Sequence, residues 1–119
     1  MRRVDKPWGH EVIWAETDRY AGKLLHIEAG HALSLQYHER KAESIYVLTG
    51  RLHLHHADSV EDEVAVQIVE AGAAFDITPG MVHRFEARED VTLIEVSTPE
   101  LDDVVRLDDR YGREGTSEA

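Results

Sequence analysis

Apolar and polar residues alternate along most of the 119-residue chain, in short runs that are rich in Val, Ile and Leu. Successive side chains of an extended strand point to opposite faces, so this alternation indicates half-buried β-strands. The runs of strand length are 11–15, 23–28, 32–37, 44–49, 51–56, 63–70 and 91–97. Gly, Pro or Asp separates them, and no long segment has the 3.6-residue apolar period of a helix. The pattern predicts an all-β sandwich or barrel with no helix longer than one or two turns.

The connections between these runs are short, as in a single compact domain. Residues 57–62 form a polar connector of hairpin-loop length, and Pro79-Gly80 is a turn dipeptide that places His83 near the start of a further strand. A chain of this length suffices for one hydrophobic core and is too short for two. We expect one domain over residues 1–113 and a disordered tail over 114–119, where small and charged residues offer nothing to bury.

Composition excludes several classes of function. Acidic residues outnumber basic ones by 24 to 13, and the resulting net charge of -11 repels nucleic acid and anionic membrane surfaces. No run of 18 apolar residues and no signal-peptide pattern is present, so a cytoplasmic protein is expected. The chain has no cysteine, which removes disulfides and thiolate chemistry. A site must therefore use His, carboxylate, amide, hydroxyl or Lys side chains, and eight histidines are available.

Four residues form a candidate metal site. Gln36 and His38 are two positions apart on a predicted strand, so their side chains share one face. Glu43 opens the next run, and His83 must arrive from a distant strand. Two imidazoles, a carboxylate and an amide oxygen form a mixed set that suits zinc, manganese, iron(II), nickel or cobalt.

These residues also lie at the spacing of two known motifs. The order Gly30, five residues, Gln36-Tyr37-His38, four residues, Glu43, six residues and Gly50 resembles the first cupin motif, with Gln36 in place of its first His. The second motif is matched by Gly72 and by Thr78-Pro79-Gly80-Met81-Val82-His83, with Thr78 where Pro is usual. The resemblance implies a cupin, a double-stranded β-helix or jelly-roll barrel.

Further segments narrow the resemblance to the type II mannose-6-phosphate isomerase domain, over residues 6 to 113. They are Lys6-Pro7-Trp8-Gly9, Tyr20 with Lys23, 33–38, 79–84, 94–96, 102–106 and 109–113. In that family Gln36, His38, Glu43 and His83 would bind one divalent metal ion, for which zinc is favoured here. The domain commonly follows a mannose-1-phosphate guanylyltransferase domain. Such a domain has no counterpart in these 119 residues, so nucleotidyltransferase activity is not expected of them.

Two departures from the family pattern bear on the substrate. The family usually has a His-rich stretch after the second ligand and His-Trp after the Glu, whereas this chain reads Glu39-Arg40-Lys41-Ala42 and Ser44-Ile45 there. Lys6 stands where Arg is usual, and Lys lacks the fork with which Arg binds phosphate. The resemblance therefore supports the fold and the metal more strongly than mannose 6-phosphate.

Candidate catalytic residues are Arg84, Lys23, Glu39 and His31. Arg84 follows the ligand His83 and would hold an anion or stabilise an enediolate. Lys23, Glu39 and His31 are the candidate bases, none of which stands out. A second cluster, His53, His55 and His56, is interpreted as a solvated outer face opposite Leu52 and Leu54.

Two functions remain open. One is an aldose–ketose isomerase that acts on a sugar or sugar phosphate with a metal ion at C1 and C2. The other is a metal-containing cupin that binds such a small molecule without turnover. An iron dioxygenase is disfavoured, because Gln36 replaces one of the three His ligands typical of that class. A homodimer is expected in either case, formed by pairing of sheet edges at residues 11–15.

Overall fold

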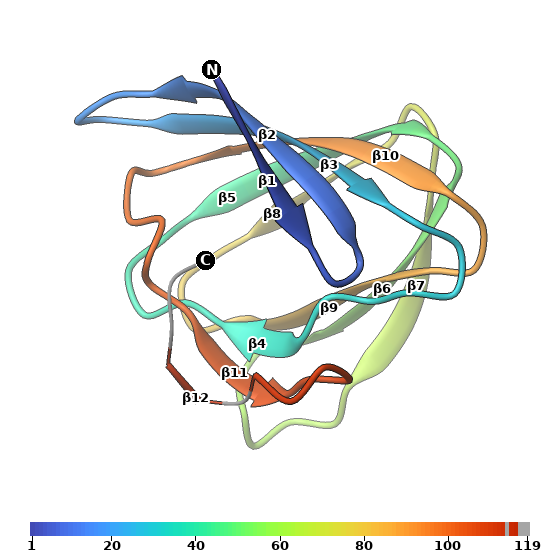
Figure 1. Cartoon of the computed structure of the whole chain (residues 1–119). Coiled ribbons are helices and arrows are strands. Elements are labelled where there is room, and N and C mark those ends of the chain that lie inside the picture. The colour runs from blue at the N-terminus through green and yellow to red at the C-terminus, as the bar shows by residue number, and fades with distance from the viewer. Residues whose placement is uncertain (114, 117–119) are drawn as a thin grey trace.

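Two antiparallel sheets form the protein in the computed structural model, which describes residues 1–113 and 115–116 (Figure 1). Sheet 1 contains, in spatial order, β1 (Arg2–Lys6), β2 (Gly9–Glu16), β3 (Ala21–Ile27), β10 (Val91–Ser97), β5 (Glu43–Thr49) and β8 (Ala74–Ile77). Sheet 2 contains β12 (Gly115–Thr116), β11 (Val105–Asp108), β4 (Leu35–Tyr37), β9 (Val82–Ala87), β6 (Arg51–Ala57) and β7 (Ala65–Glu70). The expected all-β architecture of two packed antiparallel sheets is confirmed, and no helix occurs in the described residues.

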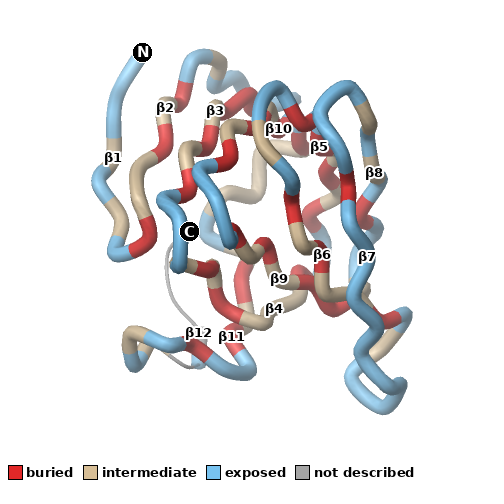
Figure 2. Tube along the Cα trace, turned by 90° about the vertical axis from the view of Figure 1, so that its right-hand side faces the viewer, coloured by how far each residue is buried: buried red, intermediate tan, exposed pale blue. Residues whose placement is uncertain are grey.

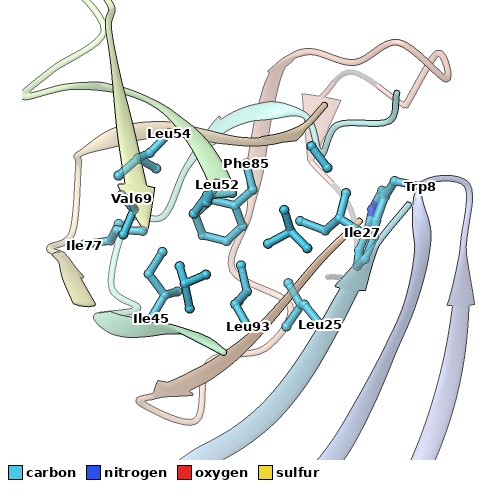
Figure 3. Close-up of a cluster of buried hydrophobic side chains, with 13 residues drawn as sticks. Trp8, Leu25, Ile27, Ile45, Leu52, Leu54, Val69, Ile77, Phe85 and Leu93 are labelled. Carbon is cyan, nitrogen blue, oxygen red and sulfur yellow. The ribbon is translucent and has the colours of Figure 1, made fainter. Parts of the chain in front are cut away.

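The sheets face each other across one interior. Sheet 1 spans the upper half of Figure 2 and sheet 2 the lower half, and the buried positions lie mainly between them. Figure 3 shows the apolar part of this interior, to which both sheets contribute. Its residues are Trp8, Leu25, Ile27, Ile45, Val47, Leu52, Leu54, Val69, Ile77, Phe85, Ala87, Val91 and Leu93.

Each of the seven predicted runs contains a strand, but the observed strands begin or end at other residues than the predicted runs. The run 32–37 is a strand only at Leu35–Tyr37, with a single bridge from Ala32 to Glu86. Sequence alternation did not reveal β1, β8, β11 or β12, which are short or rich in charged residues. β12 places Gly115–Thr116, part of the expected tail, beside β11. The remainder of that tail, residues 114 and 117–119, lies outside the described residues.

One expectation about a sheet edge is wrong. The run 11–15 belongs to β2, which pairs with β1 on one side and β3 on the other. Its backbone is therefore already hydrogen-bonded and cannot add to the sheet of a second copy. The polar strand β1 forms the edge instead.

Gly50 connects β5 to β6 in a position that requires glycine. Its φ is +82°, and an added Cβ would lie 2.3 Å from the carbonyl oxygen of Asp90. Both the left-handed backbone and the close approach of the 88–90 turn exclude a side chain here. This glycine lets β5 turn directly from sheet 1 into sheet 2.

No helix among the described residues is long and apolar enough to cross a membrane.

The segment between β10 and β11 holds the loop that follows β4. The Asp103 carboxylate accepts hydrogen bonds from the backbone N–H groups of Glu39, Arg40 and Lys41, at 3.1, 2.6 and 2.9 Å. Burial raises the pKa of Asp103, but these three donors outweigh that effect and lower it below its ordinary value. The carboxylate thus joins two loops that are far apart in sequence.

Asp103→Ala should destabilise the protein by about 1–3 kcal/mol, because three backbone donors lose a charged acceptor. Urea unfolding of Asp103→Ala and of wild type at pH 7 measures the loss. The difference should shrink as the pH falls below about 3.8, since a carboxylate with a lowered pKa stabilises the fold only while it is ionised. Asp102→Ala, at the exposed neighbouring position, is the matched control. Equal losses in the two variants would contradict the assigned role.

Candidate metal centre

Strand pairing brings the four predicted ligands together. Gln36 in β4 and His83 in β9 are direct cross-strand partners. His38 follows β4 by one residue, and Glu43 is the first residue of β5 in the opposite sheet. His38, Glu43 and His83 are at most 5% exposed, so the site lies in the interior between the two sheets.

The two imidazoles converge on the Glu43 carboxylate. His38 Nε2 lies 3.6 Å from Glu43 Oε2, and His83 Nε2 lies 3.5 Å from Glu43 Oε1. One donor atom from each of the three residues lies within 4.8 Å of the others. This spacing matches three ligands around one cation rather than three hydrogen-bonded side chains.

Backbone carbonyls set the orientation of both imidazoles. His38 Nδ1 lies 2.5 Å from the carbonyl oxygen of Asp103, and His83 Nδ1 lies 3.0 Å from that of Met81. A carbonyl only accepts, so each neutral ring carries its proton on Nδ1 and has a free lone pair on Nε2. This is the arrangement in which metal-binding histidines are usually held.

Burial favours the protonation states that bind a metal. It lowers the pKa of His38 to about 4, although Glu43 opposes the shift. It also lowers the pKa of His83. Burial raises the pKa of Glu43, but Lys41, followed by the two imidazoles, outweighs this and lowers it to about 2. Two neutral imidazoles and an ionised carboxylate therefore face one another at neutral pH.

The amide group of Gln36, the fourth predicted ligand, lies beside His83. Its Nε2 lies 3.4 Å from His83 Nε2, and its Oε1 accepts a hydrogen bond of 2.7 Å from Ser34 Oγ. A half-turn of the amide exchanges nitrogen and oxygen and presents the oxygen toward His83. Ser34 can then accept from the amide, so neither group loses its partner.

The residues fit a divalent cation by a second criterion. His38 Nε2 is buried and has no hydrogen-bond partner among the described residues. A buried polar atom without a partner is costly, and a cation bound to its lone pair would remove that cost. Two nitrogens and carboxylate or amide oxygens suit zinc, manganese, iron(II), cobalt or nickel.

A buried lysine stands beside this centre. Lys41 Nζ lies 3.0 Å from Glu43 Oε2 and 3.2 Å from Glu95 Oε2. Burial lowers the pKa of Lys41, but Glu95 and Glu43 outweigh this and raise it above its ordinary value. Burial and the neighbouring Glu43 raise the pKa of Glu95. Lys41 therefore links the Glu43 carboxylate to a second buried carboxylate.

These groups line a cavity that encloses about 40 Å³, space for about three water molecules. Trp8, Leu25 and Phe85 belong to both the apolar core and the cavity wall, so the core forms one side of the cavity. The lining also includes Arg106 and Arg113 from the C-terminal segment. The interior therefore consists of two parts, an apolar core and a cavity lined by charged side chains.

Only one of the four predicted catalytic residues lines this cavity. Lys23 does so and is buried. The side chains of Arg84, Glu39 and His31 are not part of the cavity lining. The structure therefore does not bring these three to the metal centre.

Strand alternation explains the position of Arg84. His83 points inward on β9, so Arg84 points outward, where Nε donates to the Leu33 carbonyl and a terminal nitrogen lies 3.0 Å from Asp108. His31 instead meets the Tyr111 hydroxyl at 2.6 Å. Glu39 is exposed on the loop held by Asp103.

Sequence reasoning missed the buried carboxylates Glu95 and Glu11 and the ammonium group of Lys41. Glu95 shares the inward face of β10 with Val91 and Leu93. A charged residue at an inward-facing position of a strand was therefore the signal by which the sequence could have revealed it. The signal is weak here because the outward residues Ile94 and Val96 are also apolar.

His53 and His55 of the second histidine cluster lie on the outer face of sheet 2, as the sequence suggested. The expectation is wrong for His56, which alternates with His55, pairs with His83 on the inward face and has its ring 5.3 Å from that of Phe75 in sheet 1. Leu52 and Leu54 are buried, whereas His53 and His55 are partly exposed. His55 Nε2 makes an ion-pair contact of 2.8 Å with Glu86. Among the described residues, only His38, Glu43 and His83 form a group with metal-ligand spacing.

Known structures share this fold. KdgF from Halomonas has a TM-score of 0.72 and 20% identity over 84% of this chain and 89% of its own. The capsular polysaccharide assembling protein CapF from Staphylococcus aureus has a TM-score of 0.80 and 20% identity over 90% of this chain and 31% of its own.

Curated sequences give closer relatives. Mannose-1-phosphate guanylyltransferase ManC from Salmonella typhimurium is 33% identical over 94% of this chain and 23% of its own length. Xanthan biosynthesis protein XanB from Xanthomonas campestris is 31% identical over 94% of this chain and 24% of its own. The chain thus spans about a quarter of each relative. The family model described as "Mannose-6-phosphate isomerase C-terminal" matches residues 1–109. The protein is therefore a cupin that belongs to the mannose-6-phosphate isomerase C-terminal family.

Proposed function

We propose that this chain is a divalent-metal-dependent cupin that binds a phosphorylated sugar and interconverts its aldose and ketose forms. The observation that carries the proposal is the convergence of His38 Nε2, His83 Nε2 and the Glu43 carboxylate within 4.8 Å in the buried interior, at a cavity that His38 and Glu43 line. Zinc is the favoured ion, and manganese, iron, nickel and cobalt suit the same donors. One solved structure of the same fold, oxalate decarboxylase from Bacillus subtilis, has Mn(II) centres.

The chemistry divides between the cation and the residues around it. A divalent cation in this site would act as a Lewis acid toward the hydroxyl and carbonyl oxygens of the sugar. His38, His83 and Glu43 would hold it, with Gln36 as a fourth ligand. Trp8, Leu25 and Phe85 form an apolar part of the cavity wall, where they limit contact with water.

Glu95 is the best-placed group to move a proton between adjacent carbons. It lines the cavity, is 4% exposed, and has a pKa raised by burial and by Glu43. A base with a raised pKa can both take up and return a proton. Lys23, its direct cross-strand partner, and Lys41 flank it and would stabilise its ionised form.

The charges on the cavity wall support a phosphorylated ligand. The charged residues of the cavity lining are five cations, Lys6, Lys23, Lys41, Arg106 and Arg113, and three carboxylates, Glu11, Glu43 and Glu95, in a protein whose net charge is -11. Glu11 lies 3.4 Å from Lys23 and 3.9 Å from Lys6, and Asp109 lies 2.9 Å from Arg113. Burial and Arg113 lower the pKa of Arg106, although Asp109 opposes the shift. The lining thus carries more cations than carboxylates, which favours an anionic ligand.

The other cations of the cavity lining lie close enough to Lys6 to lower its pKa. Burial lowers the pKa of Lys6, and the surrounding Lys23, Arg113 and Arg106 lower it further, although Glu11 opposes the shift. A phosphate dianion would relieve this repulsion. The relatives' names point to the same chemistry, because a mannose-1-phosphate guanylyltransferase acts on a phosphorylated sugar.

The size of the cavity favours a second candidate function. About 40 Å³ accommodates a cation with one or two waters but not a hexose ring, so a sugar must displace side chains at the mouth. A metal-containing module that binds a small ligand without converting it needs no such rearrangement around Glu95.

Metal binding should depend on His83. His83→Ala removes the ligand from sheet 2 that faces Glu43, and we expect the stoichiometric metal of the wild-type protein to be lost. Elemental analysis of protein purified without a His tag and without added metal measures this. His53→Ala, on the outer face of sheet 2, is the matched control and should keep the metal. If His83→Ala retained the metal and His53→Ala lost it, the metal would be bound by the outer histidines and the assignment to His83 would be wrong.

Isomerase activity should depend on both the metal and Glu95. We expect NMR to show interconversion of mannose 6-phosphate and fructose 6-phosphate that stops on chelation and resumes when metal is restored. Glu95→Gln should keep the metal and lower turnover by about 10²–10⁴-fold, the usual effect of a general base. Glu86→Gln, a carboxylate on the outward side of the neighbouring sheet, should leave turnover unchanged.

A metal-loaded protein that binds sugar phosphates without converting any of them would favour the binding module. Turnover that survives chelation would contradict the metal-dependent mechanism.

A further inference from the structure

A second pocket adjoins the metal cavity on the inner face of sheet 1. It has a volume of about 360 Å³, whereas the cavity encloses about 40 Å³. Lys6, Glu11 and Lys23 line both spaces and therefore form the wall between them. Pockets that bind small molecules have volumes of about 300–1,000 Å³, so this pocket is large enough for a sugar phosphate and the cavity is not. We call it the side pocket; the rest of its lining is Arg2, Val4, Ile13, Glu16, Leu101 and Asp102.

A row of cross-strand partners leads from the side pocket to the metal cavity. Arg2, Ile13, Lys23 and Glu95 are successive partners on β1, β2, β3 and β10, which Figure 2 shows in this order. Directly opposed residues of antiparallel strands share a face, so Arg2 and Ile13 lie on the same side of the sheet as the cavity residues Lys23 and Glu95. Ile13 and Glu95 are two strand spacings apart, about 10 Å. The row therefore joins the two spaces along one face.

The wall between the two spaces is held together loosely. Lys23 Nζ lies 3.4 Å from one Glu11 oxygen, and Lys6 Nζ lies 3.9 Å from the other. A tight hydrogen bond between charged groups measures about 2.7–2.9 Å, so neither contact is tight. Lysine also carries its charge on a flexible four-carbon stem. Both ammonium groups can therefore exchange Glu11 for a ligand oxygen without breaking a strong contact.

The charges of the side pocket suit an anion at its inner end. Lys6 and Lys23 are largely buried there and share the carboxylate of the wall. At the mouth, Arg2 lies 3.2 Å from Glu16, but both side chains are about half exposed, and such a pair is weak enough to leave Arg2 available to a ligand. Asp102 is also exposed at the mouth, where water and salt screen its charge. Positive charge is thus concentrated beside the wall.

A pocket on the outer face of sheet 1 offers no such route. It has a volume of about 440 Å³ and shares Glu43 with the cavity. Its lining includes Ser44 and Val96, which alternate along β5 and β10 with the inward residues Glu43 and Glu95. The sheet itself therefore lies between that pocket and the metal centre.

We propose that a sugar phosphate binds across the wall, with its carbonyl end at the metal centre and its phosphate in the side pocket, where Arg2, Lys6 and Lys23 contact it. The proposal rests on the proposed function and names the subsite that selects a phosphorylated sugar. The carbonyl carbon and its neighbour must reach the cation and Glu95, so the rest of the molecule extends along the row toward Arg2. Entry then requires the two lysine side chains to move, while the apolar core stays intact.

A bulky side chain in the side pocket should block this binding. We expect Val4→Trp to weaken the affinity of the whole, zinc-loaded chain for sorbitol 6-phosphate by about tenfold or more, because the indole ring occupies the space of the ligand. Sorbitol 6-phosphate has no carbonyl group and cannot be isomerised, so calorimetric titration measures binding alone. Asp5→Trp, at the next position of β1 on the outward face, is the matched control and should bind as wild type does. Circular dichroism and elemental analysis confirm that each variant is folded and keeps its metal.

Two arginines on opposite faces of β1 test the position of the phosphate. Arg2→Gln should weaken binding of sorbitol 6-phosphate by about three- to tenfold and leave the weaker binding of sorbitol unchanged, since a half-exposed contact with the phosphate is lost. Arg3→Gln removes the same charge from the outward face, where Arg3 lies 3.0 Å from Asp5, and should alter neither affinity. Equal losses in the two variants would indicate a general effect of net charge and would overturn the assigned contact.

Turnover separates this proposal from the proposed function. If the chain interconverts mannose 6-phosphate and fructose 6-phosphate, Arg2→Gln should raise KM and leave kcat nearly unchanged, because its contact is remote from the reacting carbons. An isomerase whose KM changes in neither Val4→Trp nor Arg2→Gln would keep the proposed function and overturn the side pocket. A protein without turnover that binds sorbitol 6-phosphate, and loses that binding in Val4→Trp, would keep the side pocket and overturn the isomerase activity. A wild type that does not bind sorbitol 6-phosphate at millimolar concentration would also overturn the side pocket.

Discussion

The buried negative charge of Glu43 is the constraint on which the site depends. A carboxylate removed from water costs several kcal/mol unless positive charge or donors surround it. Lys41 supplies one such charge at 3.0 Å, and the two imidazole Nε2 atoms at 3.5 and 3.6 Å leave room for another. The pairing of β4 with β9, and the hold of Asp103 on the 39–41 loop, keep these groups around one point. A cation at that point would complete the balance of charge.

The same strands build both the apolar core and the charged cavity. Along the inward face of β10, Leu93 packs in the core, and Glu95 two positions later lines the cavity. β3 makes the same change from Leu25 to its neighbour Lys23. A small domain can hold several buried charges in this way, because the apolar half of each strand stabilises the sheet while the other half carries the site. The charges in turn are matched across strands, as Lys23 and Glu95 are.

The fold and the grouping of His38, Glu43 and His83 were predictable from sequence, because both follow from local pattern and motif spacing. Alternation located seven of the strands. The other residues around the site were not predictable in this way. Arg84 adjoins a ligand in sequence but points to the opposite face, and Glu95 reaches the cavity only through the pairing of β10 with β3 and β5. Such placements depend on the register between strands that are distant in sequence, and this register cannot be inferred from a single sequence. The run 11–15 was mistaken for an edge for the same reason, since β1 is too polar to be recognised as its partner.

X-ray diffraction from crystals grown with Mn²⁺ or Zn²⁺, with anomalous data collected at the metal edge, tests the metal centre most directly. The account predicts one strong peak at about 2.0–2.2 Å from Nε2 of His38, Nε2 of His83 and an oxygen of Glu43. A map without a peak at these atoms, or with its only peak at His53 and His55, would contradict it.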